Sequence, residues 1–433
     1  MEWYSFLGFS LTILVVLFCM GMPIAIAFFA VNIISLLVLM GPASLLLLTT
    51  SMLASTSSFS LAAIPLFILL GDILHQSKAV EIMFDAVDKW VGGVRARLHI
   101  VTVIVATIFG ALSGAAIGTV ATMGTTIFPE MNRRGYDKML SAGAICAGAS
   151  LAPIIPPSIL AIVVATLANV SVAKLLISGI IPGVILAGIF VIYILIRVRL
   201  TPALAPTYDV SKIDFLQKVW ALLRFLPFSA IIFLVLGLIM LGIATPTESA
   251  ATGVIGALLV AALYRRLTFT AIKNSVFSTM KISGMILIIM ASAQAFSQVI
   301  ALSGAAKGLI ELINYISVPQ MVMFAIMNII VLFLCCFMDQ VSLMMILIPI
   351  YIPIIQLFGF DPIWFWLIIL INITVGGISP PFGYVLFSFK GTTTELTLQE
   401  TYRAIIPFVL LFVIGMLLVT LFPPLATWLP SKL

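Results

Sequence analysis

Long apolar runs separated by short polar breaks make up almost the whole chain. A helix that crosses a bilayer needs about 17 to 25 predominantly apolar residues, and many of the runs have about that length. The pattern therefore predicts an all-α polytopic membrane protein. We expect crossings near residues 4–20, 23–40, 60–75, 138–167, 175–196, 224–241, 247–264, 281–301, 361–390 and 404–425.

Three shorter segments carry a different pattern. Glu81, Asp85 and Asp88 alternate with apolar residues at helical spacing within 78–97, and a similar amphipathic pattern returns at 307–315. A helix with one charged and one apolar face lies in the membrane interface. The apolar segment 44–54 is too short to cross, so we expect it to form an interfacial arm.

The most unusual stretch runs from Gly110 to Ser158. Thirteen of the seventeen residues from Gly110 to Thr126 are Gly, Ala, Ser or Thr, and three prolines fall between Pro153 and Pro157. Small residues let another backbone approach, whereas each proline removes a backbone donor. One interpretation is tight helix packing beside a proline kink. The other is a re-entrant hairpin at 98–130, with its tip near Ser113 and Gly114, followed by a broken helix that faces a cavity.

A second copy of this stretch favours the hairpin. Its turn-forming residues recur 224 positions later: Pro129, Gly135, Asp137, Pro156 and Pro157 match Pro353, Gly359, Asp361, Pro380 and Pro381. The second hairpin is expected at 318–357, with its tip near Met338 to Ser342, and the second broken helix at 361–390. The chain therefore divides into a repeat at 1–200, a link at 201–223 and a repeat at 224–433.

Each repeat is expected to hold five crossings and one re-entrant hairpin. In the first repeat we place scaffold helices at about 1–58, the arm, hairpin and broken helix at about 60–170, and a closing helix at about 174–198. An odd number of crossings turns the second repeat upside down in the membrane. Basic residues support this, because Arg95, Arg97, Arg133 and Arg134 flank the first hairpin, whereas 308–389 contains no Lys or Arg. By the positive-inside rule, the first hairpin base and the central link are cytoplasmic, and both termini lie on the opposite side.

The remaining chemistry narrows the class of protein. Only 8% of the residues are charged, and the net charge of +6 reflects membrane topology, not nucleic-acid binding. No phosphate-binding loop with its Lys is present, which argues against ATP-driven transport. An intramembrane aspartyl protease built on Asp137 and Asp361 fails because the inverted topology puts them at opposite faces. A channel requires a continuous polar path through the membrane. The paired hairpins favour instead a transporter that works by alternating access.

Few acids lie at membrane depth, chiefly Asp72 and Asp339, with Glu248 at a span end. Asp339 is either functional or the cap of a hairpin helix. A coupling cation would therefore be held mostly by carbonyl and hydroxyl oxygens, and Na+ is the natural choice. The N-termini of broken helices attract an anionic group such as a carboxylate.

Taken together, the motifs resemble the large membrane subunit of tripartite ATP-independent periplasmic (TRAP) transporters. The resemblance covers essentially the whole chain and rests on Gly21–Ala25, Pro65–Ile68, Ser113–Ala116, Gly135–Asp137, Ile155–Ser158, Thr245–Ala250, Phe337–Asp339, Gly359–Pro362 and Ser379–Pro381. It implies a multi-pass subunit of the bacterial inner membrane with periplasmic termini. It further implies import of an organic acid, such as a C4-dicarboxylate or sialic acid, by a Na+-driven elevator mechanism.

The resemblance also implies partners and sites. The partners are a small four-helix membrane subunit and a periplasmic substrate-binding protein. No organic cofactor is implied, and Na+ is the only metal. By motif, the first Na+ site falls on Ser113, Ala115, Ala152, Ile155 and Pro157, and the second on Met338, Gly376, Ser379 and Phe382. Candidates for the substrate cavity are Ser113, Gly114, Pro156, Ser158, Asp339, Pro380 and Pro381.

Two points qualify this assignment. Ala115 and Ala152 stand where the family often has Ser and Gly, and Ser379 stands where Thr is common. The departures leave backbone carbonyls as the main expected ligands. The competing interpretation is a stand-alone Na+-coupled carboxylate symporter of the related two-hairpin superfamily, which needs no binding protein.

Overall fold

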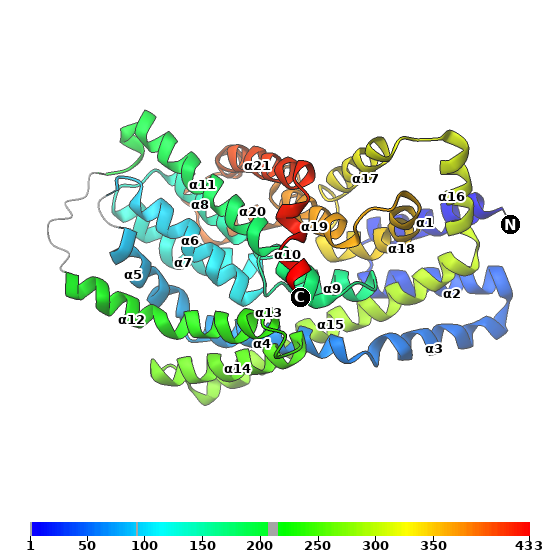
Figure 1. Ribbon diagram of the computed structural model, residues 1–433, viewed down its shortest axis with the longest axis horizontal. Helices are drawn as coiled ribbons and strands as arrows, with labels where there is room; N and C mark the ends of the chain where they lie inside the picture. The colour runs from blue at the N-terminus through cyan, green and yellow to red at the C-terminus, as the bar shows by residue number, and fades with distance from the viewer. Residues whose placement is uncertain (1, 92–93, 207–214) are drawn as a thin grey trace.

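The chain folds entirely into helices over the residues that the computed structural model describes, 2–91, 94–206 and 215–433 (Figure 1). The first half contains α1 (Trp3–Cys19), α2 (Ile24–Met40), α3 (Leu45–Thr56), α4 (Ala63–Gln76), α5 (Ala79–Val91), α6 (Arg97–Ser113), α7 (Ala116–Arg133), α8 (Lys138–Ala149), α9 (Ile159–Leu167), α10 (Val172–Ser178) and α11 (Ile180–Leu200). The second half contains α12 (Phe215–Ile232), α13 (Leu238–Met240), α14 (Pro246–Leu263), α15 (Phe269–Leu302), α16 (Ala305–Ile316), α17 (Gln320–Leu334), α18 (Gln340–Phe358), α19 (Pro362–Ile378), α20 (Tyr384–Thr392), α21 (Leu398–Leu421) and α22 (Pro424–Thr427).

Many of these helices suit a bilayer. Within the described ranges, seven helical segments are long and apolar enough to cross: Phe59–Gln76, Val172–Leu200, Val219–Met240, Pro246–Leu263, Phe269–Leu302, Gln340–Phe358 and Leu398–Leu421. Shorter apolar helices include α1, α2, α6, α8, α17 and α19. The predicted all-α membrane class is therefore confirmed.

The helices form two groups. α15 packs against α2, α3 and α4, and α4 packs along α14, so that these helices share one long edge of the molecule (Figure 1). The two helical hairpins, α6–α7 and α17–α18, lie on the other side of that edge and approach the centre from opposite ends. Between the hairpins lie α19, α20 and α10. This arrangement brings the hairpin tips together with the ends of the broken helices.

The first hairpin turns where the sequence predicted. α6 ends at Ser113, and Gly114 follows in the left-handed backbone region at φ +62°, which glycine adopts without penalty. Gly114 also lies close to the start of α9, because a methyl group there would come within 2.9 Å of the Ile159 side chain. The tip rests on α4, since a methyl group on Gly71 would come within 2.6 Å of the Ser113 backbone. Glycine is thus needed at position 71 for the contact with Ser113 and at position 114 for the contact with Ile159.

The matching turns of the two halves are built alike. Gly135 and Gly359 both have positive φ, at +80° and +66°. Two residues later, Asp137 accepts a hydrogen bond from the Leu140 backbone N–H at 2.7 Å, and Asp361 accepts one from Trp364 at 2.9 Å. Each aspartate therefore caps the helix that follows it. The 224-residue offset found in the sequence thus joins residues with the same local role.

Both broken helices are also present. α8 ends at Ala149 and α9 begins at Ile159, whereas α19 ends at Ile378 and α20 begins at Tyr384. The Pro156–Pro157 and Pro380–Pro381 bonds in these breaks are both cis. α20 then packs across α7, where the Phe128 and Phe389 ring centroids are 5.1 Å apart. This packing ties the second break to the first hairpin.

Several predicted boundaries were wrong. α15 begins at Phe269, twelve residues before the expected start at 281, because Thr268 caps it by accepting from the Ala271 N–H at 3.1 Å. The second hairpin turns at 335–339, so Gln340 to Ser342 belong to α18 rather than to the tip. The crossing expected at 175–196 is divided between α10 and α11, and α11 continues to Leu200, the last residue before the predicted link. Residues 207–214 of that link lie outside the described residues.

Candidate functional site

A cavity of about 240 Å³ lies where the two hairpins meet the two breaks. The first hairpin, the first broken helix, α15, the second hairpin and the second broken helix all contribute to its wall. The lining residues are Gly114, Ala115, Ala116, Ile117, Pro153, Ile159, Leu160, Val163, Ile282, Ile286, Gln340, Val341 and Tyr384. The wall is mostly apolar, as in typical small-molecule sites.

Four helices begin at this cavity. The lining includes the first residue of α7, α9, α18 and α20, which are Ala116, Ile159, Gln340 and Tyr384. The first N–H groups of a helix lack an intrahelical acceptor and carry partial positive charge. The starts of α9 and α18 are already capped by the Ser158 and Asp339 side chains, whereas no side chain caps α7 or α20. The first N–H groups of α7 and α20 therefore favour an anionic guest. No acidic residue is among those that line it.

Two of the three candidate acids of the membrane region, Asp339 and Glu248, stabilise helix starts. Asp339 caps α18, because one carboxylate oxygen accepts from the Val341 and Ser342 N–H groups at 3.0 and 3.1 Å. Asp72 lies on α4, and its carboxylate oxygen Oδ2 is buried without a hydrogen-bond partner among the residues that the structure describes. Glu248 accepts from the Thr245 N–H at 2.8 Å in a capping box at the start of α14. Of the two readings left open for Asp339, the structure shows the capping one.

The first group of predicted ion ligands surrounds the first hairpin tip. The Ser113 hydroxyl donates to the Gly110 carbonyl at 3.2 Å and lies 3.1 Å from the Thr119 hydroxyl. Gly110 packs on Ala152, whose Cβ would lie 3.3 Å from a methyl group there. Within the described part of the chain, nothing donates a hydrogen bond to the carbonyls of Ala152, Ile155 and Pro157. Such carbonyls are suitable ligands for a hard cation.

The second group surrounds the second break. The Ser379 hydroxyl donates to the Val375 carbonyl at 2.7 Å, which leaves its own oxygen lone pair for another partner. The Gly376 carbonyl already accepts from the Ser379 N–H at 3.2 Å. The carbonyls of Met338, Ser379 and Phe382 receive no hydrogen bond from the residues that the structure describes. These oxygens also fit a cation such as Na+.

Comparison with known proteins places the chain in a family. Residues 11–425 match the model of the tripartite ATP-independent periplasmic transporter, DctM component. The chain belongs to this family. It is 30% identical to the C4-dicarboxylate TRAP transporter large permease protein DctM of Pseudomonas aeruginosa, over 92% of each chain. It is also 30% identical to the 2,3-diketo-L-gulonate TRAP transporter large permease protein YiaN of Escherichia coli, over 89% of this chain and 90% of the other.

The fold has a solved counterpart. The crystal structure of the YdaH transporter of Alcanivorax borkumensis superposes with a TM-score of 0.66 and 14% sequence identity, over 91% of this chain and 90% of the other. At that identity the likeness concerns the fold alone. Because the TRAP family is one of transporter permeases, the protein is a multi-pass membrane transporter subunit and not an enzyme. Asp137 and Asp361, the residues of the rejected protease interpretation, are helix caps.

The substrate candidates suggested by the TRAP motifs divide into two sets. Gly114 lines the cavity itself, and the half-buried Ser113 stands beside it at the tip. Ser158 is fully buried, donates to the Pro153 carbonyl at 2.7 Å and caps α9, so its hydroxyl supports the break. Pro381 is exposed, and its carbonyl accepts from the Tyr402 hydroxyl at 2.8 Å. Pro156 and Pro380, like these two, are not among the lining residues.

The side chains of two candidate ion-binding residues do not face the predicted ion sites. Ile155 packs against Gly183 of α11, and Phe382 is 44% exposed. Only their backbone carbonyls remain as ligands, as the TRAP resemblance implied.

Sequence reasoning missed other residues of the wall. Gln340 donates to the Ile373 carbonyl at 3.1 Å and Tyr384 begins α20, and both line the cavity. Gln340 could have been found as the polar neighbour of Asp339 in an apolar stretch. Ile282 and Ile286 of α15 carry no such signal, because their place depends on packing between distant segments.

Proposed function

We propose that the chain is the Na+-coupled permease subunit that imports a small organic acid by an elevator mechanism. The observation that carries this proposal is the meeting of four helix N-termini at one apolar cavity between the hairpins. At α7 and α20, which no side chain caps, a carboxylate finds N–H donors, and the apolar wall encloses the rest of a small molecule.

Na+ coupling is supported by the oxygens near the cavity. Both breaks contain carbonyls that accept no hydrogen bond from the described residues, at Ala152 and Pro157 and at Ser379 and Phe382, and each group has a serine hydroxyl beside it. Bound Na+ adds positive charge near the carboxylate. Binding of cation and anion therefore becomes mutually favourable, which is what coupled transport requires.

The elevator mechanism is supported by the two helix groups. The sequence pattern groups residues 60–170, which include α4, with the first hairpin. Because α4 packs along α14 and α15, we propose instead that it belongs to the scaffold with α1–α3 and α12–α15. The hairpins and broken helices form the moving part. The contact of Gly71 with Ser113 is a smooth boundary between the two parts, since neither side presents a large side chain there. We keep the inverted orientation of the repeats and the cytoplasmic central link as parts of the proposal.

Membership of the TRAP family supports delivery of the substrate by a separate binding protein. The names of the two relatives describe TRAP large permeases for a C4-dicarboxylate and for 2,3-diketo-L-gulonate, which are both carboxylates. We propose that this chain works in the inner membrane with a small membrane subunit and a periplasmic substrate-binding protein. The substrate class is a small carboxylate.

Reconstitution tests the proposal. The chain and its small subunit are placed in liposomes, and uptake of a labelled organic acid is measured with and without an inward Na+ gradient and the binding protein. We expect uptake only when both are present. Uptake that needs Na+ but no binding protein would identify a stand-alone symporter, and uptake without Na+ dependence would overturn the coupling.

A further inference from the structure

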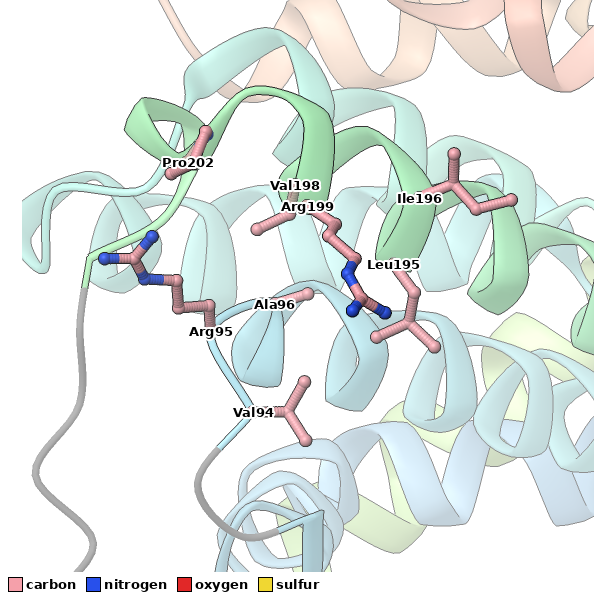
Figure 2. A pocket seen from close by; sticks show the side chains of 8 residues that line it. All are labelled: Val94, Arg95, Ala96, Leu195, Ile196, Val198, Arg199 and Pro202. Carbon is pink, nitrogen blue, oxygen red and sulfur yellow. The ribbon is translucent and has the colours of Figure 1, made fainter.

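A second cavity, of about 420 Å³, lies far from the hairpin tips, between the start of α6 and the end of α11 (Figure 2). It is lined by Val94, Arg95, Ala96, Leu195, Ile196, Val198, Arg199 and Pro202. Figure 2 shows Arg95 rising from the segment before α6 and Arg199 from the last turn of α11, on the two sides of Ala96. This cavity has no part in the proposed transport site.

The charge of this cavity is entirely positive. Both arginines are exposed, and the lining contains no acid. Asp88 of α5 does not line it and is already ion-paired with Arg97 at 2.6 Å. Ala96 is the N-cap of α6, so the positive end of that 17-residue helix lies at the cavity wall, although the Arg97 N–H already donates to the Val94 carbonyl at 2.9 Å. Two guanidinium groups and a helix N-terminus are suited to phosphate.

The rest of the wall is apolar and open. Val94, Leu195 and Ile196 are 40%, 38% and 54% exposed. Leu195 and Ile196 belong to the last turns of a segment that is long enough to cross the membrane, so they face acyl chains just inside the headgroup layer. A ligand that satisfies this surface needs an anionic head and an apolar tail.

We propose that this cavity binds the headgroup of an anionic phospholipid. Arg95 and Arg199 hold the phosphate, and the acyl chains lie along Leu195 and Ile196. Because α6 is the first helix of the hairpin, the lipid would hold the hairpin base at the membrane surface. Basic pockets between transmembrane helices are known to select anionic headgroups in this way.

Native mass spectrometry of the full chain in detergent tests the proposal. The probes are phosphatidylglycerol and phosphatidylethanolamine with identical acyl chains. We expect one phosphatidylglycerol to bind at least tenfold more tightly than phosphatidylethanolamine. Removing both charges, in Arg95→Gln/Arg199→Gln, should weaken phosphatidylglycerol binding by roughly ten- to thirtyfold.

Arg265→Gln/Lys273→Gln is the matched control, because it removes two exposed basic residues that do not line the cavity. A thermal unfolding curve of each variant without lipid separates lost binding from lost folding. Equal affinity for the two lipids, an equal loss in the control, or a loss of less than twofold in the double variant would overturn the proposal. Displacement of the lipid by millimolar inorganic phosphate would show a free-phosphate site instead and overturn it too.

Discussion

Gly376 of α19 lies directly against Cys335 at the tip of the second hairpin. A methyl group on Gly376 would overlap the Cys335 sulfur and come within 2.9 Å of its carbonyl oxygen. The tip therefore rests on the helix backbone, one turn before the break at Ser379. This contact fixes how the second group of candidate ion ligands is held.

Gly376→Ala should consequently push the tip away from α19. We expect a loss of stability of about 1 to 3 kcal/mol, as for overpacked cores, together with loss of substrate uptake. Gly284→Ala is the control, because no atom lies within 4 Å of the methyl group it adds. Thermal unfolding and uptake by both variants check this. Normal uptake by Gly376→Ala would show that the close contact is not required.

Filling the cavity between the hairpins should block substrate binding. Ile117 lines that cavity and is 51% exposed, so Ile117→Trp adds bulk there without disturbing a packed core. We expect uptake to fall at least tenfold with unchanged protein amount in the membrane. Ile255→Trp, at a 58% exposed position of α14, should transport normally. Equal uptake by the two variants would argue against this cavity as the substrate site.

The ion pair between α5 and α6 should matter more than a pair at the surface. The side chain of Arg97 is 4% exposed and that of Asp88 17%, whereas Arg133, paired with Glu130, is 77% exposed. Removing one partner of a buried pair leaves an uncompensated charge, so Arg97→Gln should cost about 3 to 5 kcal/mol. Arg133→Gln should cost about 0 to 1 kcal/mol. Similar melting temperatures for the two variants would contradict this reading.

The two capping aspartates should contribute similar stability, because they occupy equivalent turns. Loss of a helix N-cap costs about 1 kcal/mol, and we expect this for both Asp137→Ala and Asp361→Ala. Asp85→Ala, at an exposed position inside α5, should have little effect. Unfolding curves of the three variants make the comparison. A change confined to one aspartate would show that the two turns are not equivalent.

Local features of the structure could be predicted from sequence because single residue types dictate them. Gly114 marks the first tip through its left-handed backbone, Asp137 and Asp361 mark helix starts, and paired prolines mark both breaks. The 224-residue offset then located the turn, the capping aspartate and the proline pair of the second repeat. Even the start of α15 follows this offset, since Leu45 of α3 corresponds to Phe269.

The features that the sequence did not predict, such as the full length of α15 and its place in the cavity wall, depend on packing between distant segments. α15 is one helix of 34 residues, whereas its counterpart is divided into α3 and α4, and polar residues such as Lys273 and Asn274 hid its first turns. The place of Ile282 in the cavity wall depends on how α15 meets the hairpins.

The central claim, that Na+ is held at both hairpin regions, is tested most directly by Na+ activation curves of uptake. The variants are Ser113→Ala and Ser379→Ala, each measured beside Ser292→Ala. Ser292 is a buried serine of α15 that donates to the Ile289 carbonyl at 2.8 Å and does not line the cavity. The Ser113→Ala and Ser379→Ala variants should each need several times more Na+ for half-maximal uptake, at unchanged protein level, while Ser292→Ala follows the wild type. Unchanged Na+ activation in both Ser113→Ala and Ser379→Ala would contradict the account.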